Sequence, residues 1–516
     1  MDRRGFITTA GALSLAAVAG DLRAADRDFD PTEQSIGSLQ RALAAGTVSS
    51  EALTASYLHR IARFDQHGQG YRSVLALNPN ALSIARALDS ERKSGKLRGP
   101  LHGIPILVKD NIETRDPVAT TAGSYALARS LRPADAPLAA RLRAAGAIFL
   151  GKANLSEWAN FRSTRSCSGW SGVGGQVRNA YDPARNPSGS SAGSGVAAAA
   201  SFCAGAIGTE TNGSILSPAS INGLVGYKPT VGVVSGQGVV PISPRQDTAG
   251  PMCRTVADAA ILASVIAERP LGFGSHGTDV EAFRLRGVRI GVMPVPQGAH
   301  PDTTALFANA RAVLEHEGAV TVDLKPPKAF DESGEYQLDG LLYEFKDAIN
   351  AYLATLDPSQ VDCKTLTDLI AFNRAHADQE LIVFGQEIFE MADAKGPLSD
   401  AAYQKALAGL KRTADVEGLA TLLGQQGVEL LMGPSNGPAD LIDPVWGDRR
   451  GGGSSQIASA AAIAGYPSLT VPAGLIDGLP VGLTLVTGRN QDGLLLQVAR
   501  AYERASNARV PPHLLS

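Results

Sequence analysis

Residues 101–111 read Leu-His-Gly-Ile-Pro-Ile-Leu-Val-Lys-Asp-Asn, and the apolar run 103–108 within them predicts a short strand. A strand that is apolar at successive positions is typical of a sheet covered on both faces. A helix is predicted over 136–146 and a second buried strand over 147–150, so helix and strand alternate along the chain. This alternation predicts an α/β architecture, in which helices pack against a sheet.

Apolar spacing predicts further helices and strands on both sides of this core. Ser49 precedes a run in which Leu53, Tyr57, Ile61 and Phe64 recur at helical spacing, as expected of a capped helix with one buried face. Other predicted helices cover 80–93, 193–201 and 306–317, and other predicted strands cover 288–293, 467–472 and 481–486. Residues from about 328 to 424 are more charged and mostly amphipathic, and are interpreted as a more variable helical region.

The composition excludes several classes of protein. The 516 residues carry a formal net charge of −3, from 47 Lys and Arg against 50 Asp and Glu. There is no basic run with interleaved aromatic residues, so no nucleic-acid partner is expected. Four scattered cysteines are too few for a disulfide framework, and no Cys/His spacing indicates zinc. They are interpreted as structural, and whether any of them pair is left open.

The first 25 residues have the features of an export signal. Arg3 and Arg4 precede the apolar Phe6-Ile7 and an Ala-rich stretch, which is the arrangement of a twin-arginine signal peptide. Cleavage near 17–19 and cleavage near 24–25 fit equally well. The apolar part is too short to span a bilayer of about 30 Å. The mature protein is therefore expected in the periplasm or outside the cell, without stable membrane association.

Two further segments stand out for their serine and glycine content. Residues 188–195 read Ser-Gly-Ser-Ser-Ala-Gly-Ser-Gly, and residues 208–215 read Gly-Thr-Glu-Thr-Asn-Gly-Ser-Ile. Together with 101–111 and the runs 222–230, 246–252, 471–474 and 477–482, they resemble the amidase-signature family over nearly the whole mature chain. The resemblance implies the amidase-signature fold over residues 26–516, a large mixed sheet covered by helices on both faces in a single domain.

The resemblance also implies a catalytic triad of Lys109, Ser190 and Ser214. A serine hydroxyl is a poor nucleophile until a base removes its proton. Lys109 ends an apolar strand, where desolvation lowers the pKa of an amine and makes the neutral base available. In the family, the attacking serine corresponds to Ser214, and Ser190 passes the proton to Lys109 from a loop with a cis peptide bond between Gly189 and Ser190.

An acyl-transfer site also needs hydrogen-bond donors for the developing oxyanion. The resemblance assigns this role to the backbone N–H groups of Thr211, Asn212, Gly213 and Ser214. Asn212 and Ser188 stand where the family usually has glycine, and Ala192 replaces another small residue. The change to Asn212 leaves the backbone donors intact and is expected to narrow the pocket.

Other interpretations of single motifs are weaker. Residues 189–193 also fit Gly-x-Ser-x-Gly, which would make Ser191 the nucleophile, but no strand is predicted before them as that motif requires. The Ser-x-x-Lys motif at 90–93 lies in a charged helix and is read as a solvated face. His102 is expected to satisfy a local hydrogen bond. Trp158 and Phe161 fit a substrate cleft and core packing equally well.

The function expected from these residues is hydrolysis of a linear carboxamide through an acyl-enzyme on Ser214, with no metal or organic cofactor. The run 160–171 is most similar to peptide amidases, which remove the C-terminal amide of peptides. An aryl or aliphatic amidase, an esterase on the same scaffold, and a non-catalytic periplasmic binding relative are the alternatives. A transamidating subunit that acts on tRNA-bound glutamate is disfavoured by the export signal.

Overall fold

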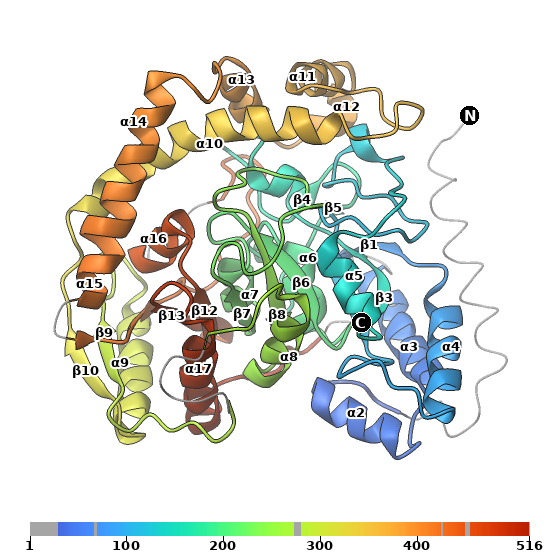
Figure 1. Ribbon diagram of the computed structural model, residues 1–516, viewed down its shortest axis with the longest axis horizontal. Coiled ribbons are helices and arrows are strands. Elements are labelled where there is room, and N and C mark those ends of the chain that lie inside the picture. Colours follow the sequence, from blue (N-terminus) through green and yellow to red (C-terminus); the bar gives the residue numbers. More distant parts are fainter. Residues whose placement is uncertain (1–28, 67–69, 273–279, 425–426, 449–454, 515–516) are drawn as a thin grey trace.

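A mixed sheet of eleven strands forms the centre of the computed structural model, which describes residues 29–66, 70–272, 280–424, 427–448 and 455–514 (Figure 1). The strand order is β1-β3-β2-β6-β8-β7-β12-β13-β11-β9-β10. The strands are β1 Val74–Leu77, β2 Pro105–Lys109, β3 Ile148–Ala153, β6 Ala206–Glu210, β7 Val225–Lys228, β8 Thr248–Cys253, β9 Arg289–Val292, β10 Val320–Asp323, β11 Leu430–Pro434, β12 Ser468–Ile476 and β13 Leu479–Thr487. A separate hairpin joins β4 Trp170–Ser171 to β5 Gly175–Gln176.

Parallel and antiparallel pairs are both present. Strand β2 runs parallel to β3 and β6, and β9 runs parallel to β10 and β11. The other neighbours are antiparallel, including the seam between β7 and β12 that joins strands from the two halves of the chain. All five residues of β2 are buried, as its continuous apolar pattern predicts.

Helices cover both faces of the sheet. Helices α6, α7 and α16 lie on one face, where side chains of α7 and α16 meet Gly226, Gly433 and Gly482 of the strands. Helices α8, α9 and α17 lie on the other. The helices are α2 Ile36–Ala44, α3 Ser50–Arg60, α4 Ala81–Lys93, α5 Pro137–Ala144, α6 Ala192–Ala199, α7 Leu216–Ile221, α8 Val256–Ile266, α9 Pro301–His316, α10 Ala329–Leu353, α11 Leu366–Ala375, α12 Ala377–Glu380, α13 Glu387–Asp393, α14 Ala401–Leu410, α15 Thr421–Gly424, α16 Gln456–Ala464 and α17 Asp492–Ser506.

Short helical turns of other kinds complete the fold. A π-helical turn Ile61–Asp65 continues α3, and a longer one, Lys411–Ala420, links α14 to α15. Two 3₁₀ turns, Tyr125–Leu127 and Glu157–Asn160, lie in the loops that follow β2 and β3.

The predicted elements of the core are confirmed to within a few residues. Ser49 accepts a hydrogen bond from Ala52 N and caps α3, whose Leu53 and Tyr57 are buried together with Ile61. The expected mixed sheet with helices on both faces is present. The helical region from about residue 328 to 424 forms α10 to α15, and α10 packs against α16 and lies across the top of the molecule in Figure 1.

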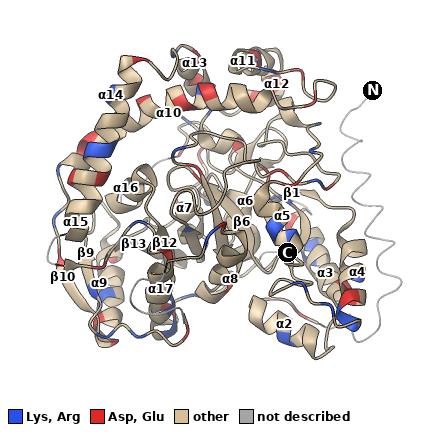
Figure 2. Ribbon diagram, viewed as in Figure 1, with Lys and Arg blue, Asp and Glu red and all other residues tan. Residues whose placement is uncertain are grey.

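Charged residues are frequent on the outer helices. Figure 2 shows acidic and basic residues along α10 and α14, away from the central strands. All four cysteines are free and buried. Within the described ranges, no helix has both the length and the apolar character that a membrane span requires. The predicted signal, residues 1–25, lies outside the described residues.

Candidate active site

Lys109 is the last residue of β2, and its side chain is fully buried. Its amine nitrogen Nζ lies 2.7 Å from Ser190 Oγ and 2.9 Å from Thr209 Oγ1, with Thr209 O at 3.4 Å. Burial lowers the pKa of Lys109 to about 7, although the charges of Asp247 and Glu210 act in the opposite direction. Near neutral pH, a substantial fraction of this amine is therefore uncharged and able to accept a proton.

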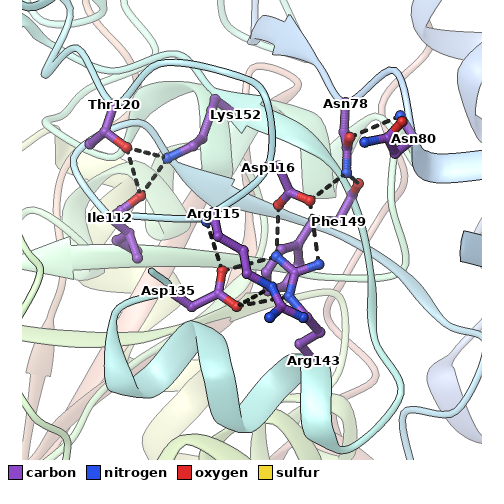
Figure 3. Close-up of polar contacts among 10 residues, drawn as sticks. All are labelled: Asn78, Asn80, Ile112, Arg115, Asp116, Thr120, Asp135, Arg143, Phe149 and Lys152. Carbon is purple, nitrogen blue, oxygen red and sulfur yellow. Dashed lines mark hydrogen bonds and ion pairs between the residues drawn. The ribbon is translucent and has the colours of Figure 1, made fainter. Parts of the chain in front are cut away.

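The segment after Lys109 is fixed by a network of polar contacts (Figure 3). Lys152 on β3 is buried, and its Nζ donates hydrogen bonds to Ile112 O and Thr120 Oγ1. On α5, Arg143 forms ion pairs of 2.8 Å with both Asp116 and Asp135. These contacts tie the loop that follows β2 to the neighbouring strand and helix, so the end of β2 is held on both sides.

Ser190 lies in the loop before α6 and is fully buried. The peptide bond between Gly189 and Ser190 is cis, as the resemblance implies. A Cβ on Gly189 would lie 2.2 Å from Ser156 Oγ, and one on Gly193 would lie 2.3 Å from the carbonyl oxygens of both Ser73 and Asn154. The first turn of α6 therefore accepts only glycine at residue 193, and a side chain at residue 189 would have to displace that of Ser156, which accounts for part of the small-residue pattern.

Ser214 lies in the turn between β6 and α7 and is 8% exposed. Its carbonyl oxygen accepts a hydrogen bond of 3.2 Å from Ser191 N, so the segments that carry Ser190 and Ser214 are adjacent. Among the described residues, Ser214 Oγ makes no hydrogen bond to Ser190 Oγ or to Lys109 Nζ. The structure thus brings Lys109 and Ser190 into direct contact and places Ser214 beside them.

The turn before Ser214 presents a row of backbone donors. The N–H groups of residues 211–214 donate to no atom of the described residues, and Gly213 has a φ of 78°. The next two N–H groups, those of Ile215 and Leu216, donate to Glu210 Oε2 at 2.8 and 3.1 Å. The helix start is therefore satisfied by Glu210, while the four preceding donors are available to an anionic ligand.

Side chains hold this turn from outside. Thr211 Oγ1 donates to Asp247 Oδ1 at 2.6 Å, and Gln246 Nε2 donates to Thr211 O at 3.1 Å. Burial raises the pKa of Asp247 to about 6, although its hydrogen bonds from Thr211 and from two backbone N–H groups favour the charged form. The turn is thus fixed without using the N–H groups of residues 211–214.

Asn212 links the turn to the C-terminal half of the chain. Its Nδ2 donates to Gln337 Oε1 of α10 at 2.9 Å and to Ser459 Oγ of α16 at 2.8 Å. Two helices therefore hold the side chain of Asn212. The helical region 328–424 thereby contributes a contact to the candidate site.

Two hydrogen-bonding groups beside Lys109 were not assigned a role from the sequence. Thr209 Oγ1 accepts a hydrogen bond from Lys109 Nζ and one of 3.0 Å from Asn111 Nδ2. Asn111 follows Lys109 in the Lys-Asp-Asn run, and Thr209 lies five residues before Ser214. A single Thr or Asn has no sequence pattern that marks it as functional. The only available indication was that both residues lie within the motifs that carry Lys109 and Ser214.

The residues of the weaker motifs have structural roles. Ser191 Oγ donates to Thr209 O and accepts from Thr209 N, so this serine connects the loop to β6, and no strand precedes it. His102 Nε2 lies 2.9 Å from Leu88 O, the local hydrogen bond expected. Ser90 lies near the end of α4, at the surface of the protein. Trp158 and Phe161 pack edge-on against the rings of Phe389 and Phe345, which identifies them as core residues.

A buried cluster of charges lies in the segment after β3. The guanidinium of Arg162 forms ion pairs with Glu157 and, at 3.5 Å, with Glu380 of α12, and all three side chains are fully buried. It also lies 4.3 Å from the ring centre of Phe384. Burial raises the pKa of Glu157 well above its ordinary value. Because one cation faces two carboxylates, this cluster retains a proton more readily than an isolated ion pair.

No group of three or more His, Cys, Asp or Glu within the described residues is arranged to hold a metal ion. The chemistry that this arrangement offers is that of a neutral amine, two hydroxyls and a set of backbone N–H donors. Such a set suits acyl transfer to a serine.

Comparison with known proteins gives consistent similarities. The family model described as Amidase matches residues 52–496. The chain is 36% identical to a probable amidase of Arabidopsis thaliana, over 95% of this chain and 93% of that protein. The crystal structure of native peptide amidase from Stenotrophomonas maltophilia superimposes with a TM-score of 0.87 at 46% identity, over 94% of this chain and 99% of that chain. That of an amidase family protein from Bacillus anthracis superimposes with a TM-score of 0.85 at 31% identity, over 99% of both chains.

Proposed function

The chain belongs to the amidase family and is a hydrolase that acts on amides, and from that premise we propose that it cleaves linear carboxamides by a Ser–Ser–Lys mechanism. In this proposal Ser214 is the nucleophile, Ser190 relays its proton, and Lys109 is the base. The backbone N–H groups of residues 211–214 bind the oxyanion.

One observation carries the mechanism: the buried amine of Lys109 lies 2.7 Å from Ser190 Oγ. A lysine in this position is useful as a base only if it is uncharged, and burial lowers its pKa to about 7. Within the described part of the chain, no histidine forms a hydrogen bond to Ser190, and His102 is engaged elsewhere. The lysine is therefore the group best placed to start proton transfer.

The proposed reaction proceeds in two stages. Ser214 Oγ attacks the amide carbonyl carbon while its proton passes to Ser190, whose own proton passes to Lys109. The tetrahedral oxyanion is bound by the turn, and the amide nitrogen leaves as ammonia or an amine after taking a proton back along the same route. Water then repeats the sequence on the acyl-enzyme, releasing the carboxylic acid and restoring Ser214.

For the substrate, we propose the C-terminal amide of peptides. The support is the similarity to peptide amidase structures, one of them in complex with the competitive inhibitor chymostatin, at 46% identity and a TM-score of 0.88. Aryl amides, aliphatic amides and esters are the other substrates to be compared.

The test is release of ammonia from peptide amides, aliphatic amides and aryl amides by the wild-type protein and by Ser214→Ala. We expect turnover of peptide amides by the wild-type protein and none by Ser214→Ala. Turnover of aryl or aliphatic amides alone would refute the peptide-amide assignment, and full activity of Ser214→Ala would refute the mechanism.

We also propose that the protein is exported through the twin-arginine route and acts in the periplasm or outside the cell. The support is the pair Arg3-Arg4 before an apolar stretch. Replacing both with lysine should retain the full-length protein in the cytoplasm, as measured by cell fractionation. An unchanged distribution of the two forms would contradict export by this route.

A further inference from the structure

The relay serine and the nucleophile come from separate segments of the chain. Ser190 lies in the loop before α6, and Ser214 lies 24 residues later, in the turn before α7 (214 − 190 = 24). No hydrogen bond joins Ser190 Oγ to Ser214 Oγ in the described part of the chain. The spacing of the two hydroxyls therefore depends on how the two segments are held against each other.

Several contacts hold the segments together, including those of Ser191 Oγ with Thr209 and of Asn222 Nδ2 with Pro187 O, and two of them lie next to the serines themselves. One is the backbone hydrogen bond from Ser191 N to Ser214 O. The other joins side chains: Ser188 Oγ lies 2.6 Å from Ser217 Oγ. Ser188 is two residues before the relay serine, and Ser217 is three residues after the nucleophile. This second contact therefore joins the two segments through residues on the far side of each serine along the chain.

Ser217 is itself fixed in place. Its N–H donates to Gly213 O at 2.8 Å, which ties it to the turn of the nucleophile. Its Oγ accepts a hydrogen bond of 2.5 Å from Asn436 Nδ2, in the loop after β11. The hydroxyl that Ser188 contacts therefore belongs to a side chain connected to both the turn and the sheet.

Ser188 is present in a backbone conformation that favours glycine. Its φ is 58°, in the left-handed region that favours glycine. Its N–H donates to Asn186 Oδ1 at 2.7 Å, so the loop conformation is supported without the side chain. The hydroxyl is thus not needed to form the loop, and its contact is with the helix that follows the nucleophile.

We propose that the hydroxyl pair Ser188–Ser217 is a positioning device that sets the distance between the relay serine and the nucleophile. The inference rests on the proposed function, because it concerns proton transfer between Ser190 and Ser214. Neither Ser188 nor Ser217 touches the substrate in this proposal. They affect the rate of acylation by holding the two segments at a fixed separation.

The first test replaces Ser188 with glycine, which removes the hydroxyl and also relieves the left-handed backbone. We expect kcat for a peptide amide to fall about 10- to 100-fold, with KM within about twofold of wild type and a melting temperature equal or higher. The rate of Ser214 labelling by a fluorophosphonate should fall in parallel. The pH at which activity is half-maximal should not move, because the surroundings of Lys109 are unchanged.

Two further variants separate positioning from folding. Ser217→Ala should lower kcat at least as much as Ser188→Gly, because it also removes the acceptor of Asn436 Nδ2. The double variant should lose no more than Ser217→Ala alone, because the two hydroxyls share one contact. Ser217→Thr retains a hydroxyl and should restore most of the rate. Ser220→Ala is the matched control. Ser220 lies on the same helix as Ser217, but its Oγ accepts a hydrogen bond from Gly482 N of β13, so stability should fall while kcat is unchanged.

The outcomes distinguish this inference from the proposed function. If Ser214→Ala is inactive while Ser188→Gly and Ser217→Ala retain wild-type kcat and labelling rates, the positioning role is refuted and the mechanism stands. If Ser214→Ala remains active, the mechanism itself fails. Additive losses in the double variant would also refute the pairing.

Discussion

Lys109 Nζ and Ser190 Oγ lie 2.7 Å apart at the end of a strand whose residues are all buried. The strand and its neighbours exclude water from the amine, and this desolvation works against the charged form. The burial that stabilises the sheet therefore also lowers the pKa of Lys109, so that its neutral form is available as a base.

The pH dependence of activity should report the pKa of Lys109. Because the base must be neutral, kcat/KM for a peptide amide should rise as pH increases and level off above about 7, the pKa that burial gives this amine. Activity should be lost below that pH because the ammonium cannot accept a proton. Initial rates measured from mildly acidic to mildly alkaline pH give this profile. A profile that is flat over the whole range would exclude Lys109 as the base.

The variants Ser214→Ala and Ser190→Ala should be far less active than the control variant Ser191→Ala. Ser214→Ala is expected to lower kcat by roughly 10⁴- to 10⁶-fold, as for other serine nucleophiles. Ser190→Ala should lose about 10²- to 10⁴-fold, the usual contribution of a proton-transfer group. Mass spectrometry after fluorophosphonate treatment of Ser191→Ala should still find the label on Ser214. A label on Ser191 in the wild-type protein would contradict the assignment.

Thr209→Val should alter the base without removing it. The substitution keeps the shape of the side chain but removes the hydroxyl that accepts hydrogen bonds from Lys109 and Asn111. Removing a hydrogen-bond acceptor destabilises the charged ammonium more than the neutral amine. The apparent pKa of activity should therefore decrease. We expect kcat to fall about tenfold, since a charge-assisted hydrogen bond contributes roughly 1.5–3 kcal/mol. An unchanged pH profile would show that Thr209 does not affect the amine.

The buried cluster of Glu157, Arg162 and Glu380 makes a prediction about stability. Arg162→Met leaves two carboxyl groups buried without their cation and should lower the free energy of unfolding by about 3–5 kcal/mol. Glu157→Gln should cost less, about 1–2 kcal/mol, because it leaves no buried charge without a partner and removes a carboxyl whose charged form burial disfavours. Guanidinium unfolding of the three proteins gives the comparison.

The pH dependence of that stability has a definite sign. Burial raises the pKa of Glu157 in the folded protein above the ordinary value of 4.5, so the folded state binds a proton more tightly than the unfolded state. The contribution of Glu157 to stability is therefore largest below the ordinary pKa of 4.5 and decreases as pH rises toward the folded-state pKa. Glu157→Gln should be free of this decrease. An identical pH dependence in the two proteins would contradict the shift.

The sequence predicted the core well because its signals are local. Continuous apolar runs gave β2 and β3, and the Ser49 cap gave the start of α3. The family resemblance supplied Lys109, Ser190 and Ser214, which the fold brings to one place. Strands such as β7 and β8 were not predicted, because they lie in a Gly- and Pro-rich stretch where propensity favours turns and only tertiary pairing makes them strands.

Apart from the triad, contacts between distant segments could not be predicted. Asn212 is held by Gln337 and Ser459, which are 125 and 247 residues further along the chain. Nothing in the local pattern of α10 or α16 marks these two side chains as partners of the turn. The same holds for Thr209 and Asn111, whose roles depend on two strands lying side by side.

The seam between β7 and β12 has a consequence for biosynthesis. Only three residue pairs, from Ser468 opposite Lys228 to Thr470 opposite Gly226, join the strands made early to those made late. The ribosome must therefore synthesise the chain as far as β12 before this pairing can form, and α16, one of the two helices that hold Asn212, also emerges late. A chain that stops before β12 therefore lacks this pairing, even though it already contains Lys109, Ser190 and Ser214.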